Sequence, residues 1–270
     1  MSKISVITVC WNCVGEIEKT LKSVLAQTYS NVEYIVVDGA STDGTLEIIN
    51  RYKDRISVLI SEPDSGLYNA MNKGVKAATG QWCIFMNAGD IFASNNVLEE
   101  MFGSHQPRQC AKVYYGNTTY VYENNDKVTL RAKPIFPEIQ RCQPYCHQSV
   151  FFNIEQKKNP FFDEKFKIAS DYNTSLWYYI NYGKNAFERT NFLVSEFSAF
   201  GGVSSLGKNF QRMWLENLDI WKHNRICRKR YLIERFKYFI IYQQPIPILK
   251  FLLKKYTNGR ILQAKARRVI

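Results

Sequence analysis

Four polar residues stand where short apolar runs of the chain end, and their side chains are of types that bind charged ligands. They are Asn12 after residues 4–10, Asp38 after residues 32–37, Asp64 after residues 56–60 and Asp90 after residues 82–86. If these runs are parallel strands, the four side chains face one rim, where open α/β sheets bind ligands. Three carboxylates gathered there repel one another. We therefore expect a divalent metal ion, or hydrogen bonds to a ligand, to offset their charge.

The segments between these runs have the pattern of helices, as a sheet that positions these side chains requires. Apolar residues from Ile17 to Leu25 share one helical face, and residues 45–52 and 70–78 also have a helical pattern. Strands and helices thus alternate over about 90 residues with short connections. This order predicts an α/β fold with a Rossmann-like, mostly parallel sheet flanked by helices. The apolar runs lack a polar alternate face, which is typical of strands buried on both sides.

The chain after residue 90 is less regular. The expected elements are a hairpin of residues 113–122 and 127–131 with its turn at 124–126, a strand at 149–152, a helix at 168–182 that opens near Asp171, and a helix at 206–221. We therefore predict one domain over residues 1–221, followed by a separate tail over residues 222–270.

Two phosphate-binding motifs are absent from the sequence. No Gly-x-Gly-x-x-Gly follows the first apolar run, and no Gly-x-x-x-x-Gly-Lys-Ser/Thr occurs anywhere. The first absence argues against redox chemistry with a dinucleotide, and the second against a P-loop nucleotide hydrolase.

Seven cysteines, an odd number without the spacing of a disulfide framework, indicate reduced thiols. Two other readings stay open. Cys10 and Cys13 form a C-x-x-C pair after a strand, as in thioredoxin-like sites, but small residues that fill space at a strand end are the simpler interpretation. Cys142, Cys146 and His147 are zinc-ligand types, but a fourth ligand at suitable spacing is missing.

Charge is divided unevenly along the chain. The formal net charge is +12. Residues 222–270 contain 14 Lys/Arg and one acid, Glu234, whereas the rest contains 22 Lys/Arg and 23 acids. A nucleic-acid-binding domain more often spreads basic residues over its folded face, so we expect no nucleic-acid partner.

The tail alternates basic clusters with apolar patches, a pattern that predicts amphipathic helices. Arg228-Lys229-Arg230 precede Tyr231-Leu232-Ile233, and further lysines surround the apolar residues 248–253. Such segments suit an anionic membrane surface; the alternative is that the apolar patches pack on the domain. No run of about 18 apolar residues and no signal cleavage site occur. We therefore expect a cytoplasmic protein, peripheral at the inner face of the plasma membrane.

The sequence resembles family 2 glycosyltransferases with the GT-A fold. The segments that carry the resemblance are ISVITVCWN, LKSVLAQTYSNVEYIVVDGASTDGT and SEPDSGLYNAMNKGVKAATGQWCIFMNAGD, which cover residues 4–90 densely. It resumes at His147-Gln148-Ser149 and at Ala169-Ser170-Asp171-Tyr172, and touches Gly201-Gly202-Val203-Ser204. The segments D-G-x-S-x-D-G-T and E-P-D-S-G-x-Y, in that order, make the match specific.

The resemblance implies transfer of a sugar from a nucleotide-sugar, of which a UDP-sugar is the expected kind, with inversion at the anomeric carbon. Residues 1–90 would form the nucleotide-sugar-binding half and residues 91–221 the acceptor-side half. The residues implied at the nucleotide-sugar are Thr8, Val9, Asn12, Asp38 reading the base, Asp64, Lys73 near the phosphates, Asn87 and His147. On the residues alone, Asp38 and Asp64 also suit turns, and Lys73 suits a solvated helix face.

The resemblance also implies a metal ion and a general base. Asn87-Ala88-Gly89-Asp90 matches the metal-binding Asp-x-Asp region, but only Asp90 is acidic there. One carboxylate with diphosphate oxygens and waters can still hold Mg²⁺ or Mn²⁺. Asp171 matches the base that takes the acceptor's proton; without the resemblance, it reads as a helix cap. His147 would contact the diphosphate or the acceptor, or be a structural histidine.

Relatives of this kind often build bacterial surface polysaccharides, O-antigen or capsule among them. The implied acceptor is a glycan, or a sugar on a polyprenyl diphosphate at the cytoplasmic leaflet. Two alternatives remain: a nucleotidyltransferase, against which the missing Gly-rich phosphate loop argues, and a non-catalytic nucleotide-sugar-binding protein, which the reduced number of metal-site acids allows.

Overall fold

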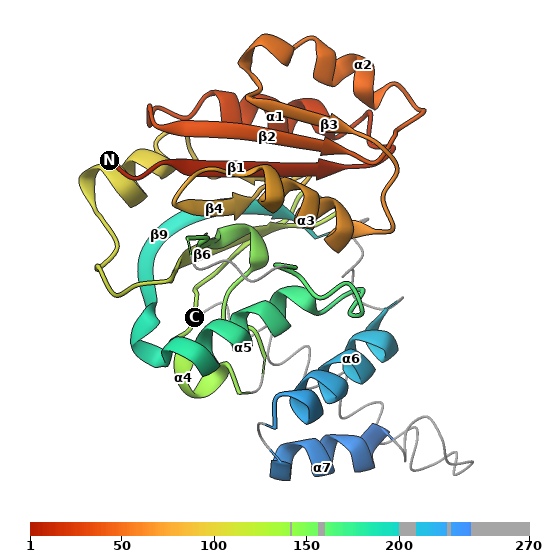
Figure 1. The fold of residues 1–270 in the computed structure, drawn as a ribbon, viewed down its shortest axis with the longest axis vertical. Helices are drawn as coiled ribbons and strands as arrows, with labels where there is room; N and C mark the ends of the chain where they lie inside the picture. Colours follow the sequence, from red (N-terminus) through yellow and green to blue (C-terminus); the bar gives the residue numbers. More distant parts are fainter. Residues whose placement is uncertain (141, 156–159, 200–208, 226–227, 239–270) are drawn as a thin grey trace. The chain divides into compact units, whose positions relative to one another are not determined.

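A computed structural model describes residues 1–140, 142–155, 160–199, 209–225 and 228–238 of the chain (Figure 1). The chain forms two compact units, Met1–Ser205 and Leu206–Ile270. Each unit is described by itself below. The domain boundary expected at residue 221 stays a prediction.

The first half of unit one is the predicted alternation of strands and helices. The strands are β1 (Ile4–Cys10), β2 (Val32–Asp38), β3 (Val58–Ser61) and β4 (Trp82–Phe85), and the helices are α1 (Ile17–Leu25), α2 (Thr45–Asn50) and α3 (Leu67–Ala77). The strands are parallel and lie in the order β3-β2-β1-β4. The predicted α/β class is therefore confirmed, and all four strand ends meet at one rim.

Alternate side chains of β1 pack on opposite faces of the sheet. Ile4 and Val6 belong to the cluster that includes Leu21 of α1. Ile7 faces α3, where a Cβ on Gly74 would lie 2.5 Å from its Cγ2. Both faces of the central strand are thus covered, which explains why its sequence has no polar alternate face.

The second half of unit one extends the same sheet with strands of mixed direction. They are β5 (Ile91–Phe92), β6 (Val113–Val121), β7 (Lys127–Leu130), β8 (Val150–Asn153) and β9 (Phe187–Ser198). The β6–β7 hairpin and the strand β8 were predicted and are confirmed. The strand β9 was not predicted; it pairs parallel with β6 and antiparallel with β5. The sheet is parallel in its first half and mixed in its second, where β6 pairs parallel with β9 and antiparallel with β7 and β8.

One helix of the second half carries the predicted base. The helix α5 (Ser170–Tyr182) has Asp171 in its first turn, as expected. Other helical segments of this half are η2 (Glu99–Ser104), α4 (Ile135–Glu138), η3 (His147–Ser149) and η4 (Lys184–Ala186), while η1 (Lys53–Arg55) lies in the first half.

Unit two contains α6 (Phe210–His223) and α7 (Arg228–Tyr238) within the described residues. The helix predicted at 206–221 corresponds to α6, and its first residues lie outside the described part. Most of the predicted amphipathic tail, residues 239–270, also lies outside it. Within the part of the chain that the structure describes, no helix is long and apolar enough to cross a membrane.

Candidate active site

Asn12 ties the loop after β1 to the loop after β2. Its backbone N–H donates to Ser41 Oγ at 2.8 Å, and its Oδ1 accepts from the Thr42 N–H at 2.9 Å. Its φ of 46° lies in the left-handed region, where asparagine is enriched among non-glycine residues. The two loops therefore form one connected wall of the rim, with the exposed Asn12 at its centre.

Thr8 and Val9 lie inside β1, below that wall. The Thr8 hydroxyl donates to the Met86 carbonyl at 2.7 Å and is hydrogen-bonded to the Tyr34 hydroxyl at 2.9 Å. The Val9 carbonyl accepts from the Ala88 N–H at 3.2 Å. These contacts join β1 to its neighbours and to the turn after β4. The predicted proximity of Thr8 and Val9 to a nucleotide stays a prediction.

Asp38 ends β2 and is completely buried. Its Oδ2 accepts from the Ser41 N–H at 3.1 Å and from Ser61 Oγ of β3 at 2.7 Å. The carboxylate therefore fixes the turn that follows β2 and connects the ends of β2 and β3. Its predicted contact with a base stays a prediction.

The carboxylate of Asp64 lies against the same turn, in space that a side chain at position 39 would occupy if that residue were not glycine. Its Oδ1 accepts from the Gly66 N–H at 2.8 Å. A Cβ on Gly39 would lie 2.5 Å from Asp64 Oδ2 and 3.3 Å from Trp11 Cδ1. The missing side chain of Gly39 thus allows a carboxylate and an indole to converge. Trp11 is 68% exposed, so its ring is available to a ligand.

Lys73 lies on α3 beside the turn that contains Asp64. Its Nζ donates to the Pro63 carbonyl at 2.7 Å and forms an ion pair with Glu62 at 2.8 Å. The ammonium group is therefore engaged by the strand-end turn. A diphosphate would have to compete with Glu62 for it.

The turn Asn87–Asp90 holds the residues expected to bind a metal. Among the described residues, no hydrogen-bond partner is found for the buried Oδ1 of Asn87. Asp90 is buried, and its oxygens accept from Gln148 Nε2 at 3.0 Å and from the Ser198 N–H at 3.1 Å. Burial raises the pKa of Asp90 to about 7, against the effect of these two hydrogen bonds.

These donors fit a divalent cation that takes most of its ligands from elsewhere. The turn offers one unpartnered amide oxygen, on Asn87, and one carboxylate that already accepts two hydrogen bonds, on Asp90. Within the described ranges, no three His, Cys, Asp or Glu side chains are grouped to hold a metal. Mg²⁺ is commonly held by one or two protein groups together with phosphates and waters.

Asp171 is the predicted base, and its carboxylate lies between two other side chains. Its Oδ1 accepts from the Tyr68 hydroxyl of α3 at 3.1 Å. Its Oδ2 lies 3.8 Å from His147 Nδ1. The side chain is 20% exposed, so a substrate hydroxyl can reach it. The predicted base and the predicted His147 are thus brought together.

The structure brings the predicted residues into two groups on the carboxyl-end side of the sheet. Asn12, Asp38 and Asp64 surround the turn after β2. Asp171 and His147 form the second group. The helix α3 connects the groups, because Asp64 lies in the turn before it and Tyr68 lies in its first turn.

Three residues in this region were given no role from the sequence. Trp11 could have been singled out as an aromatic residue directly after a buried strand. Tyr68 belongs to the quoted E-P-D-S-G-x-Y segment, but nothing local indicates that its hydroxyl reaches Asp171. Gln148 follows His147, and its contact with Asp90 depends on tertiary packing.

The cysteine alternatives can be compared with the structure. The six cysteines within the described residues are free thiols. Cys10 Sγ lies 3.6 Å from the Val37 carbonyl and 3.8 Å from Asp38, and a hydrogen bond with Cys13 together with burial holds the Cys10 pKa far above its usual range. Cys142, Cys146 and His147 are not grouped as a metal site among the described residues. The simpler interpretation of Cys10 remains that it is a small buried residue that fills space at the strand end.

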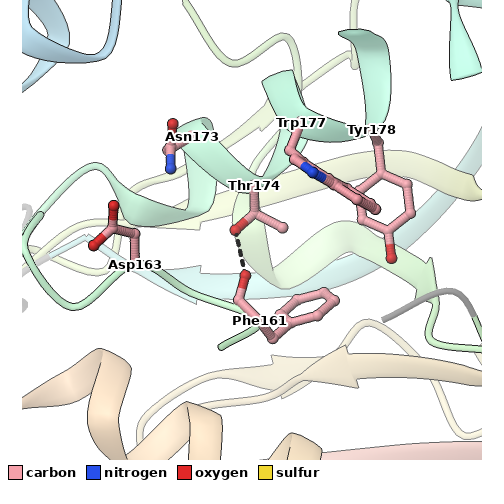
Figure 2. A pocket seen from close by; sticks show the side chains of 6 residues that line it. All are labelled: Phe161, Asp163, Asn173, Thr174, Trp177 and Tyr178. Carbon is pink, nitrogen blue, oxygen red and sulfur yellow. Dashed lines mark hydrogen bonds between the residues drawn. The ribbon is translucent and has the colours of Figure 1, made fainter. Parts of the chain in front are cut away.

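A shallow pocket lies on the flank of α5 (Figure 2). It encloses about 260 Å³, part of it open to solvent, and is lined by Phe161, Asp163, Asn173, Thr174, Trp177 and Tyr178. The Thr174 hydroxyl donates to the Phe161 carbonyl at 2.9 Å across its floor. None of the predicted site residues lines this pocket, and its volume is below the usual range for ligand sites. This pocket is therefore not the proposed donor site.

A parallel half-sheet with carboxylates at its rim, continued by a mixed half in which Asp171 opens a helix, is the architecture of the GT-A fold. The sequence model described as "Glycosyl transferase family 2" matches residues 5–172. The chain belongs to this family.

Solved structures and a curated relative agree with this assignment. The structure of Staphylococcus aureus TarS in complex with UDP superposes with a TM-score of 0.61 at 18% identity, covering 82% of this chain and 65% of that one. Glucosyl-3-phosphoglycerate synthase from Mycobacterium tuberculosis, in complex with Mn²⁺, UDP and glucosyl-3-phosphoglycerate, gives 0.51 at 17% identity, covering 72% and 71%. These two likenesses confirm the predicted GT-A fold.

The curated relative is the Escherichia coli UDP-Glc:alpha-D-GlcNAc-diphosphoundecaprenol beta-1,3-glucosyltransferase WfaP. It is 31% identical over 130 residues, which are 48% of this chain. The match spans half of the relative's own length.

Proposed function

We propose that the chain is an inverting glycosyltransferase that moves a sugar from a UDP-sugar to a hydroxyl group of an acceptor. The observation that carries the proposal is the hydrogen bond between Tyr68 and Asp171 at 3.1 Å. It connects the helix that follows the turn of Asp64 to the carboxylate that we propose as the base. Donor and acceptor chemistry can therefore meet within one site.

The nucleotide would bind at the rim formed by the loops after β1, β2 and β3. Trp11 supplies an exposed ring on which a base can stack. Asp64, which is half-buried, supplies a carboxylate that can accept hydrogen bonds from N–H and hydroxyl groups, whereas the buried Asp38 holds the turn beside it. TarS and the mycobacterial synthase both form complexes with UDP, which supports a uridine nucleotide here.

The transfer step needs a base on the face of the sugar opposite the leaving nucleotide. Asp171 would accept the proton of the acceptor hydroxyl as its oxygen forms the bond to the anomeric carbon. The bond from that carbon to the diphosphate oxygen breaks, and the pair of electrons leaves with the nucleoside diphosphate. Lys73 would then offset the charge that develops on the diphosphate.

A divalent ion, Mg²⁺ or Mn²⁺, would be held by Asn87 and Asp90 together with the donor diphosphate. Such an ion supplies charge neutralisation at the leaving group. Titration of UDP with and without Mn²⁺ in the wild type and in Asp90→Ala tests this role of Asp90. An equal effect of the metal in both proteins would remove Asp90 from the metal site.

The acceptor would be a glycan or a lipid-linked sugar used in surface polysaccharide biosynthesis. Support comes from the name of the relative WfaP, which includes a diphosphoundecaprenol substrate. The helix α7 offers exposed apolar side chains, with Leu232 at 56% and Phe236 at 64% exposure, among basic residues. This combination suits an anionic membrane surface, where such an acceptor is located.

A panel of UDP-, GDP- and dTDP-sugars with Mn²⁺ tests the donor first. A ligand that binds only the folded state raises apparent thermal stability. We expect the largest increase with a UDP-sugar, followed by transfer of that sugar to a lipid-diphosphate acceptor. Stabilisation without turnover would favour the non-catalytic binder. Release of pyrophosphate from a nucleoside triphosphate and a sugar phosphate would favour the nucleotidyltransferase.

A further inference from the structure

His147 packs inside an aromatic cage next to the candidate base. Its ring is stacked on Phe85 of β4, with centroids 5.2 Å apart and planes at 25°. The Phe162 ring meets it edge-on at 5.8 Å. Only 10% of the His147 side chain is exposed. Within the described residues, neither ring nitrogen has a hydrogen-bond partner.

Packing does not account for a histidine at this position. A buried polar group without a partner costs about 1–3 kcal/mol, so a native example needs an explanation. A phenylalanine would fill the same cage between Phe85 and Phe162 without that cost. The nitrogens of His147 must therefore serve a purpose other than filling space.

The carboxylate of Asp171 lies beside the His147 ring. His147 Nδ1 lies 3.8 Å from Asp171 Oδ2, which is too long for a hydrogen bond but short enough for a small side-chain rotation to form one. The other carboxylate oxygen already accepts from Tyr68 at 3.1 Å. The carboxylate is therefore flanked by a phenol on one oxygen and an imidazole on the other.

We propose that His147 is a positioning residue for the base, donating from Nδ1 to Oδ2 of Asp171 in the substrate-bound enzyme while Tyr68 holds Oδ1. This inference rests on the proposed role of Asp171. A base that is held at both oxygens presents a fixed lone-pair direction to the acceptor hydroxyl. Hydrogen bonds of catalytic groups are commonly long without substrate and shorten in the complex. The acceptor proton goes to Asp171, and His147 remains neutral throughout.

The surroundings of His147 favour a neutral donor. Burial holds the pKa of His147 below its ordinary value, and the charge of Asp171 opposes this effect. Phe85 and Phe162, which pack against the ring, bring no charge. A neutral imidazole can donate a hydrogen bond through one N–H. Because it carries no positive charge, it lowers the proton affinity of the Asp171 carboxylate less than an imidazolium would.

Four variants test this role through transfer kinetics. In His147→Phe, which keeps the aromatic packing, we expect kcat to fall about 10-fold or more while the KM for donor stays unchanged. His147→Asn places an amide nitrogen near the position of Nδ1, whereas His147→Gln places it near Nε2. We therefore expect Asn to retain more activity than Gln. His105→Phe is the matched control, because His105 is exposed and its ring contacts Phe192.

A second measurement does not depend on transfer. NMR titration of the imidazoles compares the wild type with Asp171→Asn. We expect the pKa of His147 to fall when the carboxylate is removed, and that of His105 to stay the same. An unchanged pKa of His147, or wild-type kcat in His147→Phe, would overturn the inference. If no donor sugar is transferred by the wild type, the proposed function fails, but the titration still decides whether His147 and Asp171 face each other.

Discussion

Three carboxylates of unit one lie in three different environments, which suit them to different proposed roles. Asp38 is buried and receives hydrogen bonds from Ser41 and Ser61. Asp90 is buried with an elevated pKa. Asp171 is partly exposed; its Oδ1 accepts a hydrogen bond from Tyr68, and its Oδ2 lies 3.8 Å from His147 Nδ1. Only Asp171 combines access to substrate with a carboxylate that is held in place, so it is the best candidate for proton transfer.

Replacing the base should remove transfer and leave donor binding intact. Asparagine in Asp171→Asn is close in shape to aspartate but cannot take the acceptor proton. We expect kcat to fall about 10²-fold or more, with an unchanged Kd for the UDP-sugar. Initial rates and calorimetric titration measure the two quantities. Asp126→Asn, in the exposed β6–β7 turn, is the control. Transfer at the wild-type rate by Asp171→Asn would disprove the assignment.

Burial of Asp90 should make stability depend on pH. Its folded-state pKa of about 7 lies above the ordinary value, so the folded state binds the proton more tightly. The stabilisation is complete below pH ~4 and is lost as pH rises through about 7, by up to about 1.4 kcal/mol per pH unit. Urea unfolding in metal-free buffer should show this fall in the wild type and a weaker one in Asp90→Asn. Parallel pH curves for the two proteins would contradict it.

The helix α3 connects the turn that contains Asp64 to Asp171, the proposed base. Its Asn72 exchanges hydrogen bonds with Phe162, donating to the carbonyl at 2.9 Å and accepting from the N–H at 2.8 Å. Asn69, which was given no role from the sequence, donates to Glu164 at 3.1 Å. These bonds fasten α3 to the segment before α5. A displacement of α3 therefore moves Tyr68 and the carboxylate it contacts.

The close packing of α3 on the sheet depends on Gly74. A Cβ there would lie 2.5 Å from Ile7 Cγ2 and 3.5 Å from Val37 Cγ2. Alanine normally stabilises a helix interior relative to glycine by about 1 kcal/mol, but overpacking costs about 1–3 kcal/mol. We expect Gly74→Ala to lower the urea midpoint and raise the KM for donor. In the control Gly15→Ala, the new Cβ meets nothing within 4 Å. A more stable Gly74→Ala protein would show that α3 has room.

Helices and strands were predictable where their hydrophobic pattern is regular and where the strands that pair are close together in the sequence. The strands β1 to β4 are short, apolar and separated by single helices, so their order in the sequence almost determines their sheet. The strand β9 gave a weaker signal because it contains four consecutive polar residues, 188–191, near its start, and its apolar residues do not alternate regularly. Its partner β6 is distant in the sequence, and β5 has only two residues. Such pairings are decided by tertiary packing.

The same distinction applies to the site. Asp38, Asp64 and Asp171 were recognisable because each follows or opens a predictable element within a specific motif. The hydrogen bond from Tyr68 to Asp171 and the burial of Asp90 were not predictable. Both depend on residues brought together from distant parts of the chain. Sequence therefore indicated which residue types gather at the rim, but not which of them remain accessible.

For the whole molecule, we expect the basic tail to anchor the enzyme reversibly to membranes. Each basic residue near an anionic surface contributes roughly 1 kcal/mol, and the attraction decays within about 8 Å at physiological salt. The full chain should sediment with anionic vesicles more than a chain ending at residue 225, and less so as salt rises. Replacing Leu232, Ile233 and Phe236 by serine should remove the part of binding that salt does not affect. Equal sedimentation of the full and shortened chains would favour a tail packed on the domain.

The bonds that join the loops after β1 and β2 bear on how quickly a donor can be captured. Asn12 contacts Ser41 and Thr42, the Cys13 N–H donates to Thr45 at 2.9 Å, and the Val14 N–H donates to Asp43 at 3.0 Å. Each of these bonds joins two groups of the chain itself and needs no nucleotide to form. Encounter therefore needs no slow rearrangement on this side, and the association rate should rise in proportion to donor concentration rather than level off. Residence time, rather than the speed of capture, would then distinguish one nucleotide-sugar from another.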